Sequence, residues 1–492
     1  MLASLLLSTF LLAATPADTI TDYYELETIA TPPGLVAEAG GLSFMPDGRL
    51  AACFHRGEVM LYNPKTKQWT LFAEGLHDPL GVLAISNREV LVMQRPELTR
   101  LTDTDGDGKA DQYETITDQF GMSGNYHEFA FGPVRDARGN LYISLNTASN
   151  GAGIRDEVRG TYQPLSRQGR MYACVPYRGW VLQIRPDGTV KPYASGFRSP
   201  NGIGFDAQGR LLVTDNQGDW LGTSKLYHVE EGKHYGHPAS LVWKDGYTDI
   251  DPLSLPTSTL DSLRTIESIN FPHELIAHSP TQVLFDNTGG KFGPFAGQTF
   301  VGEMDFSRLI RILPDVVQGQ LQGACLPFFD KAGLRIGNNR MAFAPDGSLW
   351  LGQTDHGWLG DRGIQRLRYV GTPKTGVPLD IMAMKLTASG FDLTFTQPLD
   401  EATAQSLANY TIERYYYEYH KAYGSPRLDV QPVAVQSAVL SADRKTVSLS
   451  LADLKPGRIY QVNLGDLRAA GGQKKLMNRL ICYTLNRLVA QP

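Results

Sequence analysis

The sequence is poor in cysteine and has no surplus of positive charge. Its 492 residues include four cysteines, Cys53, Cys174, Cys325 and Cys482, and none of them forms a CxxC or CxxCH motif. A zinc ribbon and a covalently attached c-type haem are therefore excluded. The four thiols allow three disulfide pairings, and they could equally remain as buried free thiols. A net charge of −5 gives no electrostatic basis for binding nucleic acid.

Long hydrophobic runs are also missing. The apolar stretch at residues 2–14 is too short to span a bilayer as a helix, but it fits the apolar region of a secretory signal peptide. The first basic residue is Arg49, so the usual positive region is absent and a buried N-terminal helix or strand is the alternative. We expect residues 1–17 to be a signal peptide of a secreted or periplasmic protein with no integral membrane segment.

Glycine is abundant, with 50 residues, and a repeated pattern explains why. An apolar alternating run, a turn and a second apolar run recur in six segments, which begin at Gly41, Gly81, Glu128, Gly202, Gln282 and Arg340. Four-stranded repeats spaced by roughly 40–80 residues are typical of β-propeller blades, whereas a β-sandwich or β-helix would give shorter and more uniform spacing. The sequence therefore predicts an all-β fold, with a six-bladed propeller over residues 18–370. We expect the segment before Gly41 to add a strand to the last blade.

The pattern changes after the last repeat. Residues 371–380 form a linker that contains glycine and proline, and residues 381–492 resume the alternation without the blade motif. These C-terminal strands predict a β-sandwich of the immunoglobulin or fibronectin III type. Its aromatic cluster at residues 415–420 is interpreted as a strand with aromatic side chains on both faces, and a carbohydrate-binding platform is the alternative.

The sharpest local motif is DTDGDGKADQYE at residues 103–114. It has the ligand spacing and the sharp-turn glycine of an EF-hand-type calcium loop, in which position 7 contributes a backbone oxygen. The predicted ligands are Asp103, Asp105, Asp107, Lys109, Asp111 and Glu114. Because the flanking segments are predicted strands, we expect this calcium ion to have a structural role in a blade loop.

A second group of polar residues lies in loops that are predicted to open on one face of the propeller. Loops that enter the first strand of a blade share that face with loops between its second and third strands. On this basis His127, Arg198, Asn201, Gln217 and Asp219 converge around one mouth. A histidine, an arginine and amides in one place suit an anionic planar ligand beside a proton that must be removed. The segment from Asp355 to Trp358 is predicted to point to the same mouth.

These motifs resemble the soluble PQQ-dependent sugar dehydrogenases, the glucose/sorbosone dehydrogenase group of six-bladed propellers. The resemblance covers about residues 30–370 and rests on four motifs in the family's order. They are His127, the run from Arg198 to Gly202, the pair Gln217-Gly218, and the run from Tyr235 to Pro238.

The resemblance implies a role for each matching residue. His127 would be the general base, and Arg198 would contact the quinone and the substrate. Asn201, Gln217 and, by a loose alignment, Lys291 would bind the cofactor. The Gly218 carbonyl and Asp219 would hold a second calcium ion. Three departures weaken the match: Ser199 replaces an asparagine, His237 replaces a tryptophan, and a paired-arginine loop is reduced to Asn338-Asn339-Arg340.

The sequence therefore predicts a PQQ-dependent dehydrogenase that oxidises a hydroxyl of a sugar or polyol. Because the chain has no haem motif, the electrons would go to a separate acceptor. Two alternatives stay open. One is a propeller without cofactor that binds carbohydrate or protein, and the other is a calcium-dependent propeller lactonase.

Overall fold

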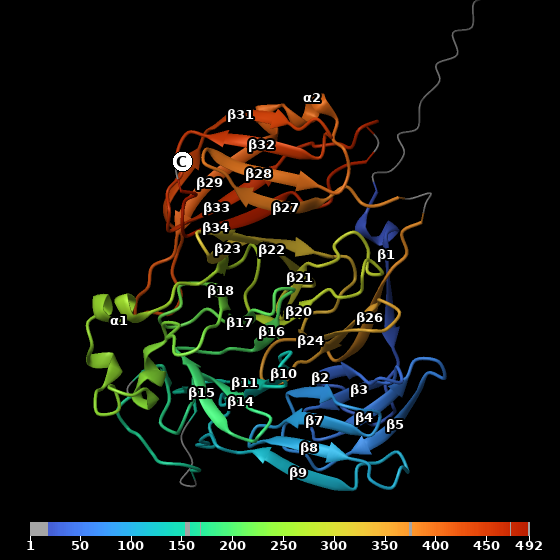
Figure 1. The fold of residues 1–492 in the computed structure, drawn as a ribbon, viewed down its shortest axis with the longest axis vertical. Helices are drawn as coiled ribbons and strands as arrows, with labels where there is room; N and C mark the ends of the chain where they lie inside the picture. Colours follow the sequence, from blue (N-terminus) through green and yellow to red (C-terminus); the bar gives the residue numbers. More distant parts are fainter. Residues whose placement is uncertain (1–17, 153–157, 168, 373–375, 473, 491–492) are drawn as a thin grey trace, which may run out of the picture.

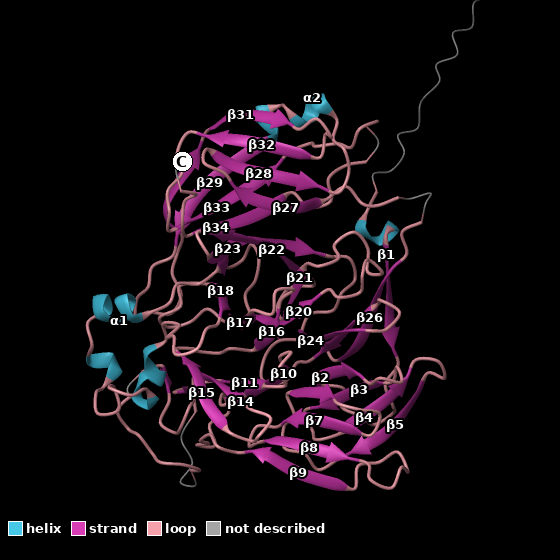
Figure 2. Ribbon diagram, in the orientation of Figure 1, coloured by secondary structure: helices cyan, strands magenta, loops and turns pink. Residues whose placement is uncertain are grey.

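The computed structural model describes residues 18–152, 158–167, 169–372, 376–472 and 474–490. The predicted signal peptide lies outside these residues. Strands dominate the described chain, which is all-β as predicted (Figure 2). The helical segments are η1 (Ile20–Asp22), η2 (Pro238–Trp243), η3 (Pro252–Ser254), α1 (Thr257–Leu263), α2 (Glu401–Ala404) and η4 (Leu407–Asn409). No helix in the described ranges is long and apolar enough to cross a membrane.

Most of the strands form antiparallel sheets that surround a common centre (Figure 1). We number these ring sheets 1 to 6 in chain order. Ring sheet 1 has β2 (Ala39–Phe44), β3 (Leu50–Phe54), β4 (Val59–Asn63) and β5 (Gln68–Ala73). Ring sheet 2 has β6 (Gly81–Ala84), β7 (Glu89–Met93), β8 (Leu98–Thr102) and β9 (Gln112–Thr117). Ring sheet 3 has β10 (Ala130–Arg135), β11 (Leu141–Leu145), β14 (Trp180–Ile184) and β15 (Val190–Ser195).

The second half of the ring follows the same plan. Ring sheet 4 has β16 (Gly202–Phe205), β17 (Leu211–Asp215), β18 (Ser224–His228) and β19 (Ile269–Phe271). Ring sheet 5 has β20 (Pro280–Phe285), β21 (Thr299–Glu303), β22 (Leu309–Val317) and β23 (Gln320–Phe328). Ring sheet 6 has β24 (Asn338–Phe343), β25 (Leu349–Gln353), β26 (Gly363–Tyr369) and, from the start of the chain, β1 (Tyr24–Ile29). The pairing of β1 with β26 confirms the predicted contribution of the segment before Gly41. A short pair, β12 (Ala148–Ser149) and β13 (Met171–Tyr172), lies in the insertion between β11 and β14.

The first strands of the ring sheets contact one another in cyclic order, from β2 through β6, β10, β16, β20 and β24 back to β2. Glycine allows this close approach. A Cβ atom on Gly81 would lie 1.6 Å from the carbonyl oxygen of Gly132, and one on Gly202 would lie 1.9 Å from that of Thr281. Both distances are far below van der Waals contact, so any side chain here would force neighbouring sheets apart. Hydrophobic clusters fill the spaces between successive ring sheets.

The C-terminal strands join the ring directly. Strand β23 pairs with β34, so ring sheet 5 continues into an eight-stranded sheet. Its added strands are β34 (Leu480–Leu485), β33 (Arg458–Leu464), β29 (Tyr410–Tyr416) and β30 (Leu428–Val433). A further sheet contains β27 (Ile381–Leu386), β28 (Gly390–Phe395), β32 (Thr446–Leu451) and β31 (Val435–Leu440). One hydrophobic cluster, which includes Phe391, Val447 and Tyr483, packs the two sheets together.

All four cysteines are buried free thiols. Cys325 and Cys482 are direct partners across the β23–β34 pairing. Burial raises the pKa of both thiols above the ordinary value, and it raises that of Cys482 to about 12. They therefore act as small apolar side chains in this part of the core.

Candidate active site

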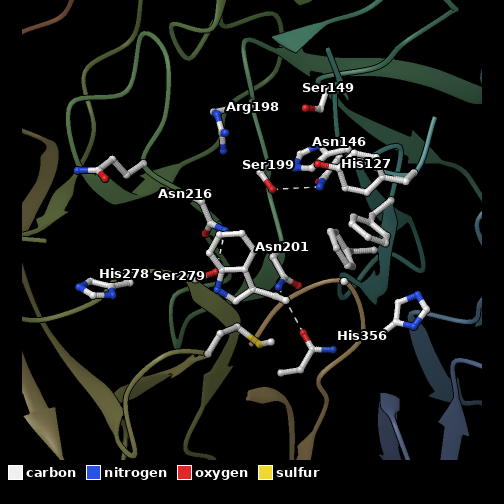
Figure 3. A pocket seen from close by; sticks show the side chains of 18 of the residues that line it. His127, Asn146, Ser149, Arg198, Ser199, Asn201, Asn216, His278, Ser279 and His356 are labelled. Atoms are coloured by element: carbon white, nitrogen blue, oxygen red, sulfur yellow. Dashed lines mark hydrogen bonds between the residues drawn. The ribbon is translucent and has the colours of Figure 1, made fainter. Parts of the chain in front are cut away.

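A cavity of about 410 Å³ opens at one end of the ring, a volume in the usual range for small-molecule sites (Figure 3). Loops that enter the first strands and loops between second and third strands surround it. The structure places His127, Arg198, Asn201 and Gln217 together in its wall. The predicted face of the ring and the predicted convergence of these four residues therefore agree with the geometry.

His127 is held as a neutral imidazole with one nitrogen free to accept a proton. Its Nδ1 lies 2.8 Å from the carbonyl oxygen of Thr147, which can only accept, so Nδ1 carries the hydrogen and Nε2 has the lone pair. Burial, together with the positive charge of Arg198, lowers the pKa of His127 to about 4. At neutral pH the ring is therefore a base rather than a cation.

Thr147 joins the two predicted catalytic residues. Its hydroxyl donates to the carbonyl oxygen of Arg198 over 2.7 Å, and its backbone N–H donates to the same oxygen over 3.1 Å. Asp215 fixes the Arg198 loop from the other side, because it accepts the backbone N–H groups of Arg198 at 2.8 Å and Ser199 at 2.6 Å. No motif in the sequence marks Thr147, because it follows β11 in an irregular insertion.

Asp219 and Gly218 lie behind Arg198 and are already fully engaged. The two carboxylate oxygens of Asp219 accept from Arg198 Nε at 3.2 Å and contact His237 Nε2 at 3.3 Å. Burial alone would raise the pKa of Asp219, but His237 and Arg198 hold it well below its usual range. The carbonyl oxygen of Gly218 accepts the N–H of Gly424 at 2.9 Å. A calcium ion here would have to displace Arg198 and His237 from the Asp219 carboxylate, so Gly218 and Asp219 as placed do not form an open calcium site.

Gly218 and Gly202 both lie where parts of the protein itself come very close together. A Cβ atom on Gly218 would lie 1.8 Å from Nε of Arg198. The close approach is therefore made by the protein's own side chain at Gly218 and by a neighbouring strand at Gly202.

The buried guanidinium group of Arg340 lies directly beneath the cavity and binds two residues of its floor. Arg340 Nη1 donates to the side-chain oxygens of Asn201 and Asn339, each at 2.8 Å, and both asparagines line the cavity. Its Nε and Nη2 donate to the carbonyl oxygens of Gly40 and Leu80. All its hydrogen-bond partners in the described chain are neutral oxygens, and no salt bridge joins Arg340 to a carboxylate there. Its positive charge is therefore not balanced by a neighbouring acid.

The C-terminal part of the chain contributes to the mouth. Tyr423, in the loop between β29 and β30, lines the cavity, and its ring centre lies 5.4 Å from the Arg198 guanidinium carbon and 4.6 Å from that of Arg170. The same loop donates the Gly424 N–H to the Gly218 carbonyl. Tyr419 secures it further, because its hydroxyl donates to the carbonyl oxygen of Gly236 at 2.6 Å. The aromatic cluster at residues 415–420 therefore docks against the ring.

Lys291 does not reach the cavity. It lies in the loop between β20 and β21, and loops between first and second strands open at the opposite end of the ring. Its Nζ donates to the carbonyl oxygen of Pro345 at 3.0 Å.

The predicted calcium loop also lies at that opposite end, between β8 and β9. The side chains of Asp103, Asp105 and Asp111 offer oxygens that lie within 4.8 Å of one another. Glu114 belongs instead to β9, and its carboxylate pairs with Arg100 at 2.8 Å. Two further predicted ligands, Asp107 and Lys109, are joined within the loop, where the Asp107 carboxylate accepts the Lys109 N–H at 2.8 Å.

Histidines provide much of the remaining wall: His55, His273, His278 and His356 line the cavity. They form two stacked pairs, His55 with His356 and His273 with His278, each with ring centres 4.1 Å apart. Of the predicted segment from Asp355 to Trp358, the last three residues line the cavity, whereas Asp355 pairs with Arg362. Sequence reasoning missed the other three histidines, because each is a single residue in a loop without a motif.

Comparison with known proteins identifies the fold. A family described as a domain of unknown function (DUF7133) matches residues 65–291, less than half of the chain. No curated protein matches the chain. A protein from Thermus thermophilus, described as an oxidoreductase (glucose dehydrogenase), has a TM-score of 0.50 and 16% identity over 70% of this chain and 99% of its own.

Two further solved structures are similar at slightly lower scores. The PQQ-bound aldose sugar dehydrogenase of Streptomyces coelicolor has a TM-score of 0.49 and 16% identity over 70% of this chain and 98% of its own. The apo aldose sugar dehydrogenase of Escherichia coli has a TM-score of 0.48 and 14% identity over 70% of this chain and 99% of its own. At these identities the Thermus likeness establishes a propeller-like all-β fold and no more.

Proposed function

We propose that this protein is an exported dehydrogenase that uses PQQ to oxidise a hydroxyl group of a sugar or polyol and passes the electrons to a separate acceptor. One observation carries the proposal: a neutral base, His127, stands beside the fixed positive charge of Arg198 in one cavity, and Thr147 joins the two. The fold shared with a protein described as a glucose dehydrogenase supports the same assignment.

The charges around the cavity fit a planar anion with several carboxylates, as PQQ is. Arg170 and Arg198 line the wall and could each form charge-assisted hydrogen bonds with a carboxylate. Arg340 lies beneath the floor without an acidic partner in the described chain, so an anion above it would be favoured. Asn201 and Gln217 would contribute amide groups to the same ligand. When bound, the quinone would accept the hydride that leaves the carbon of the substrate hydroxyl.

The protein's own residues account for the proton. His127 Nε2 would remove the hydroxyl proton as the carbonyl product forms, and the Nδ1 hydrogen bond to Thr147 would keep the ring in place while it becomes charged. Arg198 has two effects. It lowers the pKa of His127, so the base is available, and it places positive charge where the substrate oxygen becomes more negative.

The proposed architecture is a six-bladed propeller at residues 18–370, a linker at 371–380 and a β-sandwich at 381–492. The cyclic contacts of the first strands and the pairing of β1 with β26 support the propeller. The shared core between the two C-terminal sheets supports the sandwich. We further propose a structural calcium ion in the loop of Asp103, Asp105 and Asp111, and export directed by residues 1–17.

Reconstitution tests the function. Purified protein is mixed with PQQ, and cofactor binding is followed by fluorescence quenching, with and without calcium. Reduction of a redox dye is then measured with a panel of sugars and polyols. We expect His127→Ala to keep PQQ binding and to lower kcat by about 10²- to 10⁴-fold. His228→Ala, in ring sheet 4 away from the cavity, is the matched control and should keep full activity.

Three results would count against the proposal. Absence of PQQ binding would favour a propeller that binds carbohydrate or protein without cofactor. Hydrolysis of lactones without PQQ would favour the lactonase. Full dye reduction by His127→Ala would refute the assignment of the base.

A further inference from the structure

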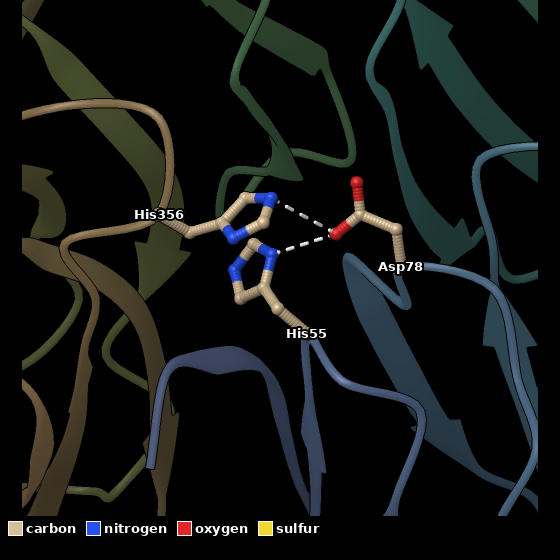
Figure 4. Close-up of side chains that lie close together, drawn as sticks. All are labelled: His55, Asp78 and His356. Carbon is tan, nitrogen blue, oxygen red and sulfur yellow. Dashed lines mark hydrogen bonds and ion pairs between the residues drawn. The ribbon is translucent and has the colours of Figure 1, made fainter. Parts of the chain in front are cut away.

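We propose that His55, Asp78 and His356 form a binding site for a first-row transition metal ion, with zinc(II) as the best match, at the edge of the cavity (Figure 4). The proposal goes beyond the dehydrogenase function and requires neither the quinone nor calcium.

Three loops that are far apart in the sequence bring these side chains together. His55 lies between β3 and β4, Asp78 between β5 and β6, and His356 between β25 and β26. In Figure 4 both imidazole rings direct a nitrogen toward the same oxygen of Asp78. Two imidazoles and one carboxylate are a common protein ligand set for zinc and for other borderline metal ions.

Two of the three distances between ligand atoms can be compared with those of a tetrahedral site. Bonds of about 2.0–2.1 Å place neighbouring ligand atoms about 3.3–3.4 Å apart. His356 Nε2 is 3.4 Å from Asp78 Oδ1, which already matches. His55 Nδ1 is 2.8 Å from the same oxygen, so this edge must open by about half an ångström when an ion enters.

Two outer residues lie against the ligands. Arg95 Nε and Nη2 donate to Asp78 Oδ2, at 3.0 and 2.5 Å, which leaves Oδ1 to the two imidazoles. Glu38 Oε2 is 3.5 Å from His356 Nδ1, an ion-pair distance in this structure. In metal sites the second N–H of a ligand histidine usually donates to a carboxylate, and Glu38 is the carboxylate placed to accept it.

A fourth ligand can reach the ion. The side chains of Asp78 and His356 are 12% and 33% exposed, and both histidines line the cavity. A water molecule, or an oxygen of a bound sugar or carboxylate, could complete the coordination. Three protein ligands with one open position are the arrangement of catalytic rather than structural zinc sites.

The second stacked pair provides an internal control. His273 and His278 have the same ring separation of 4.1 Å. Their neighbouring carboxylate, Asp305, contacts only His278 with one oxygen, at 3.1 Å, and accepts from Trp358 Nε1 with the other. This pair therefore offers no shared carboxylate oxygen, and it should not bind the metal.

Metal titration of the full chain without an affinity tag tests the site. The protein is treated with a chelator and titrated with zinc, and with cobalt(II) as a spectroscopic probe. We expect one tightly bound ion per chain and the visible absorption of nitrogen-coordinated cobalt. His55→Ala and His356→Gln should lose both, Glu38→Gln should weaken binding about 10- to 100-fold, and His278→Ala should bind as the wild type does. Asp105→Asn, in the predicted calcium loop, should also bind as the wild type does, because that loop is a separate site.

Absence of zinc and cobalt uptake by the wild type would overturn the proposal, as would equal uptake by wild type and His356→Gln. The latter variant decides the question if the buried His55→Ala fails to fold, because His356 is partly exposed. No quinone or substrate enters the titration, so its failure would leave the dehydrogenase proposal untouched.

Discussion

His127 is expected to stay neutral far below the pH at which an ordinary histidine takes up a proton. Burial and the charge of Arg198 lower its pKa to about 4, whereas an unperturbed histidine titrates near pH 6.5. The difference corresponds to about 3 kcal/mol of additional free energy for protonating the ring in the folded protein. Arg198→Met removes the positive charge and should raise the pKa of His127, and Arg198→Lys should leave it low.

NMR of protein labelled with ¹³C-histidine can follow this titration without cofactor or substrate. The chain has 10 histidines, and the signal that is missing in His127→Gln identifies the one of interest. We expect this signal to show the neutral ring throughout the range of about pH 5–8, in which an unperturbed histidine takes up its proton. A wild-type midpoint near pH 6.5, or the same midpoint in wild type and Arg198→Met, would refute the reasoning.

The same shift has a consequence for stability. The unfolded chain binds the proton near pH 6.5 and the folded protein only near pH 4, so the unfolded state gains protons first as the pH falls. His127 therefore leaves stability unaffected above about pH 6.5 and lowers it progressively between pH 6.5 and pH 4. From about pH 7 to about pH 4.5 the wild type should lose about 2 kcal/mol more than His127→Gln, measured by chemical denaturation. An equal loss in both proteins would contradict this expectation.

Three further predictions concern other parts of the molecule. Arg311 and Asp380 form a fully buried ion pair at 3.1 Å between β22 and the C-terminal sheets. Arg311→Met should lower the free energy of unfolding by about 3–5 kcal/mol in denaturant titrations, and adding Asp380→Asn to this variant should restore part of the lost stability. If the double variant recovers none, the unpaired Asp380 charge is not the cause. Tyr423 is 49% exposed, so Tyr423→Ala should leave the Tm unchanged. The variant should raise KM about fivefold, because it loses about 1 kcal/mol of binding free energy. A lowered Tm with an unchanged KM would refute a role of Tyr423 in binding. Calcium at 100 times its Kd should stabilise the folded wild type by about 2.7 kcal/mol, measured as a rise in Tm that a chelator reverses. The same rise in Tm for Asp105→Asn would show that calcium binds elsewhere.

The sequence predicted the ring well because its signals are local. Alternating apolar runs around turn residues specify each pair of strands, and the order of loops follows from antiparallel pairing. The same reasoning about loop faces brings His127 and Arg198 to one cavity from different ring sheets. It also explains Lys291, whose loop follows a first strand and opens at the other end. The family resemblance predicted Lys291 in the cavity, whereas the strand order places it at the opposite end of the ring.

The rest of the site depends on contacts that no local pattern encodes. Tyr423 reaches the cavity because its loop bonds to Gly218 and Gly236, and because β29 and β33 join the ring through β34. His55 meets His356 because ring sheets 1 and 6 are neighbours in the closed ring, although they are at opposite ends of the repeat. Asp219 is a predicted calcium ligand, but its carboxylate oxygens contact Arg198 and His237 from two other loops, and no local pattern marks these contacts.

The pairing of β23 with β34 makes the cavity depend on a strand near the end of the described chain. Without β34, ring sheet 5 would end at β23 with an open strand edge. Strands β33 and β29, which carry the loop with Tyr423, join the ring sheet through β34. Loss of β34 would therefore remove both the cover of that edge and one support of the cavity rim.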